Sequence, residues 1–187
     1  MSQHVITIFG GGDCGEGDPL FAAAEQLGAE CARRGWSIAN GGYGGTMLAA
    51  ARGSSRAGGR AIGVTCRFFR AAANPFISEA IATPTLHDRI RKLVELGDGY
   101  VVLPGATGTL AELAIAWELV NKRIIPERPI VCLGDYWRPV VDLISNASRR
   151  DKRIPGLEHE PGGVGELVAF ADDAAGVMKK LDEKLGG

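Results

Sequence analysis

The chain repeats one arrangement three times: a short apolar run, a glycine-rich turn, and a segment with helical character. The apolar runs are residues 5–9, 36–39 and 100–103, and the turns that follow them begin at Gly10, Gly41 and Gly105. Such runs are typical of strands buried on both faces, and their alternation with helices predicts a doubly wound, mostly parallel, Rossmann-like α/β sheet with helices on both faces. Because parallel strands end at one edge of a sheet, we expect the three turns to gather on one rim, where ligands bind.

The other segments continue this alternation, and we expect a single Rossmann-like nucleotide-binding domain over residues 1–187. Further strands are expected at 60–65, 79–82, 129–133 and 167–170. Further helices are expected at 20–34, from 46 to the Gly58-Gly59 pair, and at 85–96, 109–123, 136–150 and 173–185. The residues expected to cap helices at their N-termini are Asp18, Thr46, Asp135 and Asp172. A solvent-exposed loop is expected at 151–165.

The turn between Tyr100 and Glu118 is the strongest candidate for a site of chemistry. A strand leads through Pro104, Gly105 and Gly108 into a helix expected to begin near Thr109, and a helix N-terminus at such a junction suits an anion such as phosphate. Glu112 has two explanations. It completes a Thr-x-x-Glu capping box with Thr109, which is the commoner role at this spacing, or it is a catalytic acid or base.

The two earlier glycine turns are less specific. Gly10-Gly11-Gly12-x-x-Gly15 matches the dinucleotide fingerprint, but the helix is delayed to Asp18-Pro19 and Asn40 follows the second strand where an acidic residue would bind ribose. We therefore expect a nucleotide-contacting loop without the dinucleotide function. The second turn, which is not a Walker A loop, comprises Gly41, Gly42, Tyr43, Gly44 and Gly45 and leads to Thr46 and Met47. It is either a close ligand contact or a flexible turn.

Arg89 lies near the start of the expected helix 85–96, on the border of its apolar stripe. It either reaches over the sheet edge toward a ligand or lies flat on the surface, which is the commoner outcome. Residues 66–78, which include Phe68 and Phe69, have little periodicity and are expected to form a long loop over the ligand face or a partner surface.

The composition argues against several classes of function. A formal net charge of −1 and a pI near 6.3 give no support for a nucleic-acid or membrane partner. No apolar run reaches the length of a membrane span and the first residues do not resemble a signal peptide, so a cytoplasmic location is expected. The four cysteines and three histidines are scattered, which indicates free, mostly buried thiols and no metal site, and no cofactor is expected.

Taken together, the motifs resemble the Lonely Guy (LOG) family, once labelled possible lysine decarboxylases. Its pattern P-G-G-x-G-T-x-x-E is matched by Pro104, Gly105, Thr107 at the variable position, Gly108, Thr109 and Glu112, with Ala106 in place of the second glycine. The upstream M-H-x-R-K element is matched by His87 and Arg89, with Leu86 for Met and Ile90 for Lys. Residues 41–47 look like the family's G-G-G-x-x-G-L-M loop, less closely.

The resemblance implies a phosphoribohydrolase, which hydrolyses the N-glycosidic bond of a nucleoside 5′-monophosphate of the AMP or N6-modified AMP type to free base and ribose 5-phosphate. By this analogy Arg89 and Glu112 form the catalytic pair and the glycine turns hold phosphate and sugar. A small-molecule nucleotide is the implied partner, and a homodimer or higher homo-oligomer is the implied assembly. An acidic residue suits an oxocarbenium-like transition state, and an arginine suits its orientation. Asp13, Asp18 and Asp88 are unranked candidates for protonating the departing base.

Two other functions remain open at this point. Molybdenum cofactor carrier proteins look like the same family, and the Ala106 and Ile90 departures leave room for a non-catalytic nucleotide- or cofactor-binding protein. A nicotinamide-dependent oxidoreductase would instead bind its cofactor through Gly10 to Gly15. The older decarboxylase label lacks support, because no lysine lies near the glycine turns to form the Schiff base that pyridoxal phosphate requires.

Overall fold

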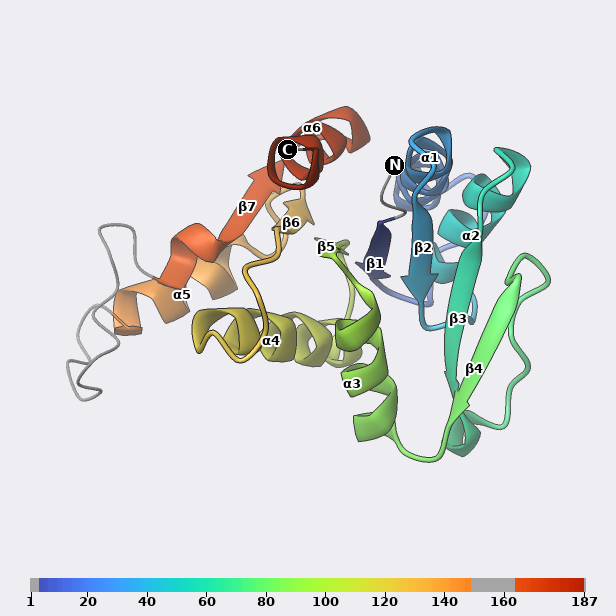
Figure 1. The fold of residues 1–187 in the computed structure, drawn as a ribbon, viewed down its shortest axis with the longest axis horizontal. Coiled ribbons are helices and arrows are strands. Elements are labelled where there is room, and N and C mark those ends of the chain that lie inside the picture. Colours follow the sequence, from blue (N-terminus) through green and yellow to red (C-terminus); the bar gives the residue numbers. More distant parts are fainter. Residues whose placement is uncertain (1–3, 149–163, 187) are drawn as a thin grey trace.

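The computed structural model describes residues 4–148 and 164–186, which form a seven-stranded parallel sheet (Figure 1). The strands are β1 (Val5–Phe9), β2 (Ser37–Asn40), β3 (Ala61–Cys66), β4 (Glu79–Thr83), β5 (Gly99–Val102), β6 (Ile130–Leu133) and β7 (Val168–Ala171). Their order in the sheet is β4-β3-β2-β1-β5-β6-β7, and every adjacent pair is parallel. The chain therefore winds outward from β1 to one edge and then returns to begin the other half at β5, as the predicted doubly wound architecture requires.

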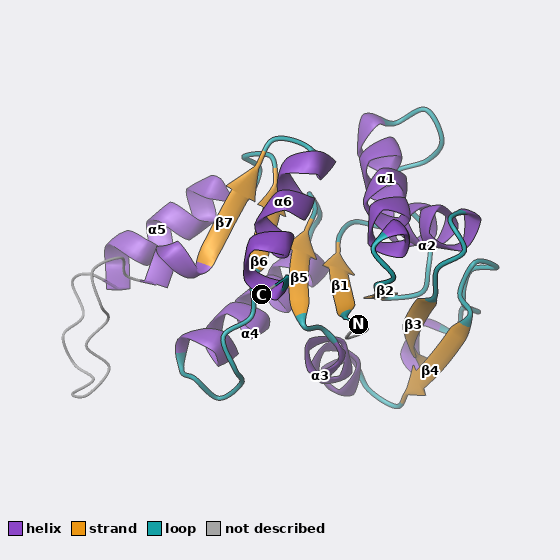
Figure 2. Cartoon of the chain, turned by 45° about the horizontal axis from the view of Figure 1, so that its top comes forward, coloured by secondary structure: helices purple, strands orange, loops and turns teal. Residues whose placement is uncertain are grey.

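Helices cover both faces of this sheet (Figure 2). The helices are α1 (Pro19–Arg33), α2 (Thr46–Arg56), α3 (Leu86–Leu96), α4 (Thr107–Asn121), α5 (Arg138–Ser148) and α6 (Ala174–Leu185), with short 3₁₀ turns η1 (Arg67–Phe69) and η2 (Val164–Leu167). One buried apolar cluster joins the sheet to α1, α2 and α6, and a second joins it to α3, α4 and α5. The molecule thus has two cores separated by the sheet.

The alternation of side chains along the central strands explains why both cores form. On β1, Ile6 and Ile8 belong to the first cluster and Phe9 to the second. On β5, Val101 joins the first cluster while Tyr100 and Val102 join the second. Successive residues of a strand point to opposite faces, so a strand that is apolar throughout is stable only when both faces are covered.

Among the residues that the structure describes, side-chain caps are seen at the starts of α1, α3 and α6. Asp18 accepts a hydrogen bond from the Leu20 N–H of α1 at 2.8 Å, as predicted. Thr85 caps α3 by accepting from Asp88 N–H, and Asp173 caps α6 by accepting from Gly176 N–H. The prediction of Asp172 was wrong by one residue. Asp135 was also misplaced, since α5 begins only at Arg138 and the Asp135 carboxylate instead pairs with the Arg138 side chain at 2.6 Å.

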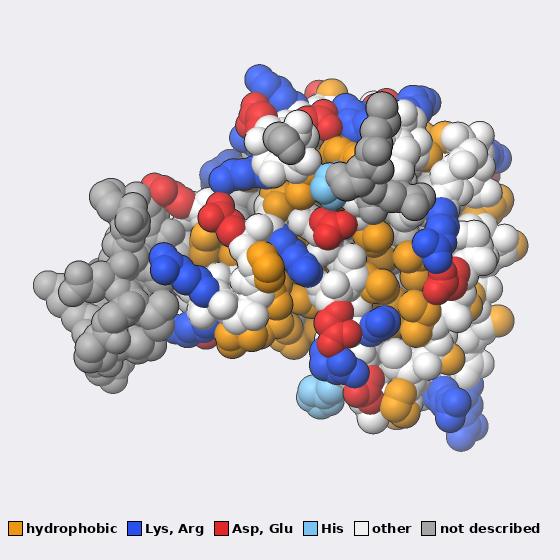
Figure 3. All heavy atoms as spheres, viewed as in Figure 1, with side chains coloured by type: hydrophobic (Ala, Val, Ile, Leu, Met, Phe, Trp, Pro, Cys, Tyr) orange, Lys and Arg blue, Asp and Glu red, His pale blue; other side chains and the backbone are white. Residues whose placement is uncertain are grey.

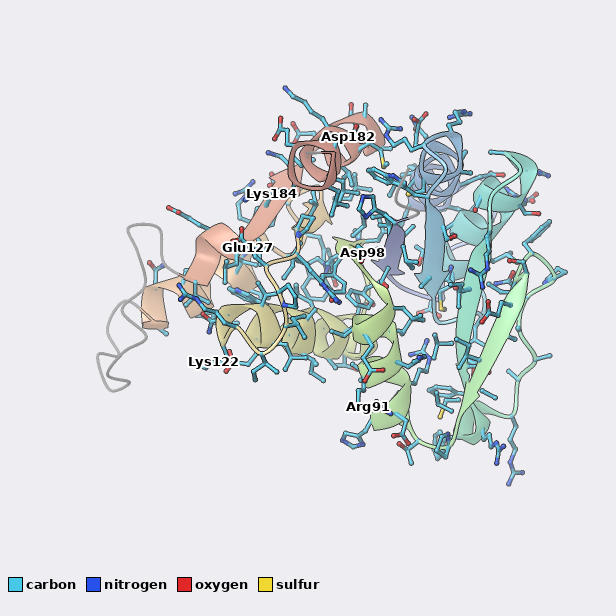
Figure 4. The ribbon with its side chains drawn as sticks, in the orientation of Figure 1. Arg91, Asp98, Lys122, Glu127, Asp182 and Lys184 are labelled. Carbon is cyan, nitrogen blue, oxygen red and sulfur yellow. The ribbon has the colours of Figure 1, made fainter. Side chains whose placement is uncertain are left out.

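Helices on the first face are tied together by ion pairs as well as by the core. Arg34, after α1, donates from Nε to Asp182 of α6 at 3.1 Å. Lys184, also on α6, pairs with Glu127 of the α4–β6 connection at 3.1 Å (Figure 4). These side chains are partly or largely exposed, so the pairs orient α6 more than they stabilise the fold.

The cysteines are as the sequence predicts. All four cysteines are free, and Cys31, Cys66 and Cys132 are buried. No helix in residues 4–148 or 164–186 is long and apolar enough to cross a membrane. Most of the expected loop at 151–165 lies outside the described residues; at its end, η2 replaces loop from Val164 onward.

Candidate active site

The three glycine turns meet at the rim where β1, β2 and β5 end, which is the point where the winding of the sheet reverses. Gly11 N–H donates to the Pro104 carbonyl at 3.1 Å and so joins the first turn to the third. The Gly11 carbonyl accepts from both the N–H and the hydroxyl of Thr46, each at 3.0 Å, and so joins the first turn to the second. The sequence-predicted turns are therefore one continuous backbone surface.

Small side chains are required where these turns touch. A Cβ on Gly10 would lie 2.5 Å from Thr46 Oγ1, and one on Gly105 would overlap Thr109 Oγ1. Gly45 has a φ of +61°, and a Cβ there would lie 2.5 Å from the Gly11 carbonyl oxygen. The turns can approach this closely only because glycine, which has no side chain, occupies these three contact positions.

Arg89 and Glu112 form a buried ion pair beside this rim. The guanidinium Nη1 donates to Glu112 Oε1 at 3.1 Å, and each residue is only 7% exposed. Arg89 Nε donates to the Val64 carbonyl at 2.9 Å, which fixes the plane of the guanidinium. Arg89 therefore does not lie flat on the surface; it reaches across the end of β3 into the site.

The second glycine turn makes room for that arginine. A Cβ on Gly41 would overlap Arg89 Nη2, so a residue other than glycine there would displace the guanidinium. Nη2 also lies 4.0 Å from Met47 Sδ, and the guanidinium carbon lies 5.7 Å from the centre of the Tyr43 ring. The turn 41–45 thus shapes the position of Arg89, which the flexible-turn explanation does not account for.

Glu112 is not a helix cap, so the capping-box prediction was wrong. Helix α4 begins at Thr107 with Ala106 as its N-terminal cap position, which places Glu112 in the second turn. Leu110 N–H donates to the Ala106 carbonyl at 3.0 Å and closes the first turn two residues earlier than expected. Glu112 consequently points to Arg89, and its role as a cap at the N-terminus of α4 is excluded.

The helices α2 and α4 begin at the rim without side-chain caps. Gly45 is the cap position of α2 and Ala106 that of α4, and neither helix start has a side-chain cap hydrogen bond or an acidic residue in its first turn. Thr46, predicted as a cap, instead uses its hydroxyl on Gly11. The first N–H groups of a helix have no partner within the helix. Thr46 N–H of α2 already donates to the Gly11 carbonyl, and the other first-turn N–H groups of the two helices, with their positive dipole ends, face an anion.

Burial raises the pKa of Glu112 from its ordinary value of 4.5 to about 7, although the positive charge and hydrogen bond of Arg89 oppose the shift. Desolvation penalises the charged carboxylate more than one arginine compensates. A carboxyl group with a pKa near neutrality exchanges protons readily at physiological pH, as a general acid or base must.

The two departures from the LOG pattern have structural explanations. Ala106 has φ −99° and ψ −156°, an extended conformation open to any residue, and its side chain is exposed. Ile90 is buried in the second core on the inner face of α3. The Arg89–Glu112 pair forms with both departures present in the chain.

Other predicted candidates are less engaged. Asp18 and Asp88 take part in hydrogen bonds at the starts of α1 and α3, and Asp13 is exposed in the β1–α1 loop. Added Cβ atoms on Gly12 and Gly44 would meet their neighbours at ordinary distances of 3.8 and 3.7 Å, and one on Gly108 would meet nothing within 4 Å. Steric crowding within the protein therefore does not explain these three glycines.

Three supporting residues were not identified from the sequence. Asn40, buried at the end of β2, accepts from Gly42 N–H at 2.8 Å and donates to the Met47 carbonyl at 3.0 Å. Asn74 donates to the carbonyls of Gly42 and Tyr43, and the Tyr136 hydroxyl donates to the Gly105 carbonyl at 3.0 Å. Asn40 was noted only as a missing acid; an amide directly after a buried strand is the signal that could have shown its role.

The model of the SLOG cluster4 family matches residues 3–152, which include the three turns and the Arg89–Glu112 pair. The chain belongs to this family. Among curated relatives of this SLOG chain, a cytokinin riboside 5′-monophosphate phosphoribohydrolase of Rhodococcoides fascians is 30% identical over 151 residues, 76% of this chain and 75% of the relative. A protein of the same name from Mycobacterium tuberculosis is 36% identical over 101 residues, 52% of this chain and 54% of that protein.

Solved structures confirm the fold of the SLOG chain. A molybdenum cofactor binding protein from Rippkaea orientalis superposes with a TM-score of 0.74 at 24% identity, with 99% of each chain covered. A molybdenum cofactor carrier protein from Chlamydomonas reinhardtii gives a TM-score of 0.73 at 22% identity, with 99% of this chain and all of the other covered. At these identities the likeness concerns the fold.

Proposed function

We propose that this protein hydrolyses the N-glycosidic bond of a nucleoside 5′-monophosphate and releases free base and ribose 5-phosphate. The observation that carries the proposal is the buried Arg89–Glu112 pair beside the three joined turns. A buried ion pair is weak as a device for stability, because desolvation offsets much of its attraction. Its position at the ligand-binding rim, with a Glu112 pKa of about 7, is better explained by catalysis.

The phosphate would bind at the uncapped N-termini of α2 and α4. Both helix starts lack a competing carboxylate and both border the joined turns. The glycine turns add backbone donors that can approach a ligand closely. A ligand that carries a phosphate fits this arrangement, and a 5′-monophosphate is what the names of the curated relatives print.

Glu112 would act on the sugar. When the bond between C1′ and the base nitrogen breaks, its electron pair leaves with the base and the sugar acquires oxocarbenium character, which a nearby carboxylate stabilises. The oxygen of a water molecule then bonds to C1′ as Glu112 accepts a proton from it, and the base nitrogen takes up a proton. With a pKa of about 7, the same carboxyl group can accept the first proton and supply the second. Arg89 holds the carboxyl in place through its Oε1 contact.

The test is incubation with AMP and with N6-substituted AMP, with free base measured by chromatography. Glu112→Gln should lower kcat by about two to four orders of magnitude, the usual range for a positioned acid or base, and leave the fold intact. Arg89→Ala should lower it as well, and Arg91→Ala, an exposed arginine on the same helix, serves as the matched control. Full activity in folded Glu112→Gln would refute the assignment.

The rival function is a non-catalytic carrier. The fold likeness to molybdenum cofactor proteins motivates this comparison, and a phosphorylated pterin is the appropriate probe. Tight pterin binding together with no base release from any nucleotide would favour the carrier. Base release that depends on Glu112 would favour the hydrolase.

A further inference from the structure

A row of aromatic rings leads from the Arg89–Glu112 pair to the surface. The Arg89 guanidinium lies 5.7 Å from the Tyr43 ring centre. Tyr43 meets Phe69 edge to face with a centroid separation of 5.6 Å, and Phe69 meets Phe68 in the same way at 5.7 Å. The row thus begins at the buried ion pair and ends in solvent, through contacts between successive neighbours.

The outer rings of this row are unusually exposed. Phe68 is 79% exposed and Phe69 is 46% exposed, on the 3₁₀ turn η1 that directly follows the carboxyl end of β3 (Figure 1). Folding alone does not account for two neighbouring phenylalanines in water, since each would gain free energy by burial. An adjoining apolar pair at the edge of a site is a surface that a ligand or partner covers.

The backbone holds these rings in position rather than leaving them on a free loop. The Tyr43 hydroxyl accepts from Cys66 N–H at 2.8 Å and donates to the Cys66 carbonyl at 3.1 Å, so the second glycine turn is fastened to the end of β3. Asn74 fastens the following segment to the same turn through the carbonyls of Gly42 and Tyr43. A fixed aromatic surface loses little conformational entropy when a flat ligand stacks on it.

We propose that Phe69, supported by Tyr43 and Phe68, forms the subsite for the base of the nucleotide. This inference rests on the proposed function for the identity of the ligand. The uncapped helix termini suit the phosphate, and Glu112 suits the sugar, so the base must project from the sugar past the pair. The aromatic row extends in that way from Arg89, and a planar purine fits it because stacking on an aromatic side chain needs only a π-face. The exposed Arg67 and Arg70 on either side give this edge a positive charge that favours an anionic nucleotide.

The test separates base recognition from recognition of sugar and phosphate. In the Glu112→Gln background, which prevents turnover, the Kd of AMP and the Kd of ribose 5-phosphate are measured by calorimetry with and without Phe69→Ala. The AMP Kd should rise on the order of tenfold, since stacking of one base contributes about that much. The Kd of ribose 5-phosphate, which lacks a base, should stay the same, and Phe69→Trp should restore AMP binding. Leu143→Ala, an equally simple truncation of an exposed side chain on α5, is the matched control.

Equal weakening of both ligands would overturn the proposal, because the ring would then only maintain the shape of the turns. Unchanged AMP binding would also overturn it, and a concurrent loss of self-association would assign the rings to contact between copies of the chain. Failure of the base subsite and failure of the proposed hydrolase function give different results. Weaker AMP binding in Phe69→Ala without base release by the wild type supports the subsite and refutes the hydrolase. Base release that depends on Glu112, together with an unchanged KM in Phe69→Ala, supports the hydrolase and refutes the subsite.

Discussion

At the scale of the residue, the central feature is a glutamate that folding places where its charge is unfavourable. Glu112 is buried beside Arg89, and its pKa is raised to about 7 by desolvation. The folded protein therefore binds the Glu112 proton more tightly than the unfolded chain does, since in the unfolded chain Glu112 has the ordinary pKa of an exposed glutamate. At neutral pH this raised pKa lowers the free energy of unfolding. The proposed benefit is a carboxyl group that exchanges protons at that pH.

This feature predicts a pH-dependent difference between the wild type and Glu112→Gln. Because the folded pKa exceeds the ordinary value of 4.5, the stabilising contribution of the protonated group is complete below about pH 4.5 and is lost as the pH rises through 7. The unfolding free energy of Glu112→Gln, minus that of the wild type, should thus rise by up to roughly 3 kcal/mol between pH 4.5 and 7.5, at about 1.4 kcal/mol per unit of pKa shift. Urea unfolding at a series of pH values measures it.

Comparison with the variant removes the effect of the other carboxyl groups. Arg52 and Arg34 lower the pKa values of Glu25 and Glu30, so these groups stabilise the fold above their ordinary pKa and lose that contribution as the pH falls. Both are present in wild type and variant, and their contributions cancel. A difference that stays constant from pH 4.5 to 7.5 would mean that the pKa of Glu112 is not raised.

In the active protein, kcat/KM should rise toward a plateau above pH 7, since Glu112 must be ionised to accept a proton.

At the scale of the element, the two helices that begin at the joined glycine turns start differently from three of the others. Asp18, Thr85 and Asp173 cap α1, α3 and α6, whereas the rim-facing α2 and α4 start at Gly45 and Ala106 without side-chain caps. A missing cap costs about 1 kcal/mol of helix stability. Two such starts side by side at the sheet's switch point are consistent with N–H groups kept for a ligand.

Gly108 provides a test of that explanation within α4. It is the second residue of the helix, its φ is not positive, and a Cβ would meet nothing within 4 Å. Gly108→Ala should therefore leave the fold unharmed or stabilise it by up to about 1 kcal/mol, since alanine favours the helix more than glycine does. If a phosphate occupies this helix start, the added methyl group should nevertheless weaken AMP binding severalfold.

Thermal unfolding and AMP titration of the same variant measure the two effects. Asn146→Ala, at an exposed position of α5, is the control, because alanine again favours the helix but α5 carries none of the three glycine turns. Stabilisation with unchanged AMP affinity would place the phosphate elsewhere.

The helix starts also show what the sequence could and could not predict. The alternation of buried strands, turns and helices was predicted because apolar periodicity reports burial directly, and the Asp18-Pro19 start was predicted because an acid before proline is locally decisive. The capping box predicted for Thr109 and Glu112 was wrong because the same Thr-x-x-Glu spacing also occurs inside a helix, where the glutamate can pair with a residue of another element. Only the approach of Arg89, 23 residues away in the sequence, distinguishes them. Local pattern cannot encode a tertiary partner.

The family resemblance supplied what the pattern lacked. It paired Arg89 with Glu112, and the structure brings these side chains together. It did not identify Tyr43, Asn74 or Tyr136, whose hydrogen bonds join segments that are distant in the sequence. Their side chains form hydrogen bonds with backbone groups of other segments, and the sequence carries no local signal for such contacts.

At the scale of the whole molecule, the outer face of α4 predicts self-association. The helix buries Glu112, Leu113 and Trp117 on its inner side, yet Ala114 and Ile115 are exposed on its outer side. Figure 3 shows hydrophobic side chains, in orange, gathered over the region of α4. A helix that is apolar nearly all round is normally covered on both sides, and two copies related by a twofold axis can cover each other.

We therefore expect a homodimer in solution, and Ile115→Lys should disrupt it because a charge would be placed in an apolar contact between copies. Ile115 is 36% exposed and belongs to neither buried cluster, so the variant should fold normally. Sedimentation equilibrium over a range of concentrations measures the assembly, with Leu143→Lys on α5 as the matched control. A monomeric wild type, or an Ile115→Lys variant that remains dimeric while Leu143→Lys dissociates, would move the interface away from α4. Because α4 carries Glu112 on its opposite side, dissociation should also lower catalytic activity if contact between copies holds the helix in position.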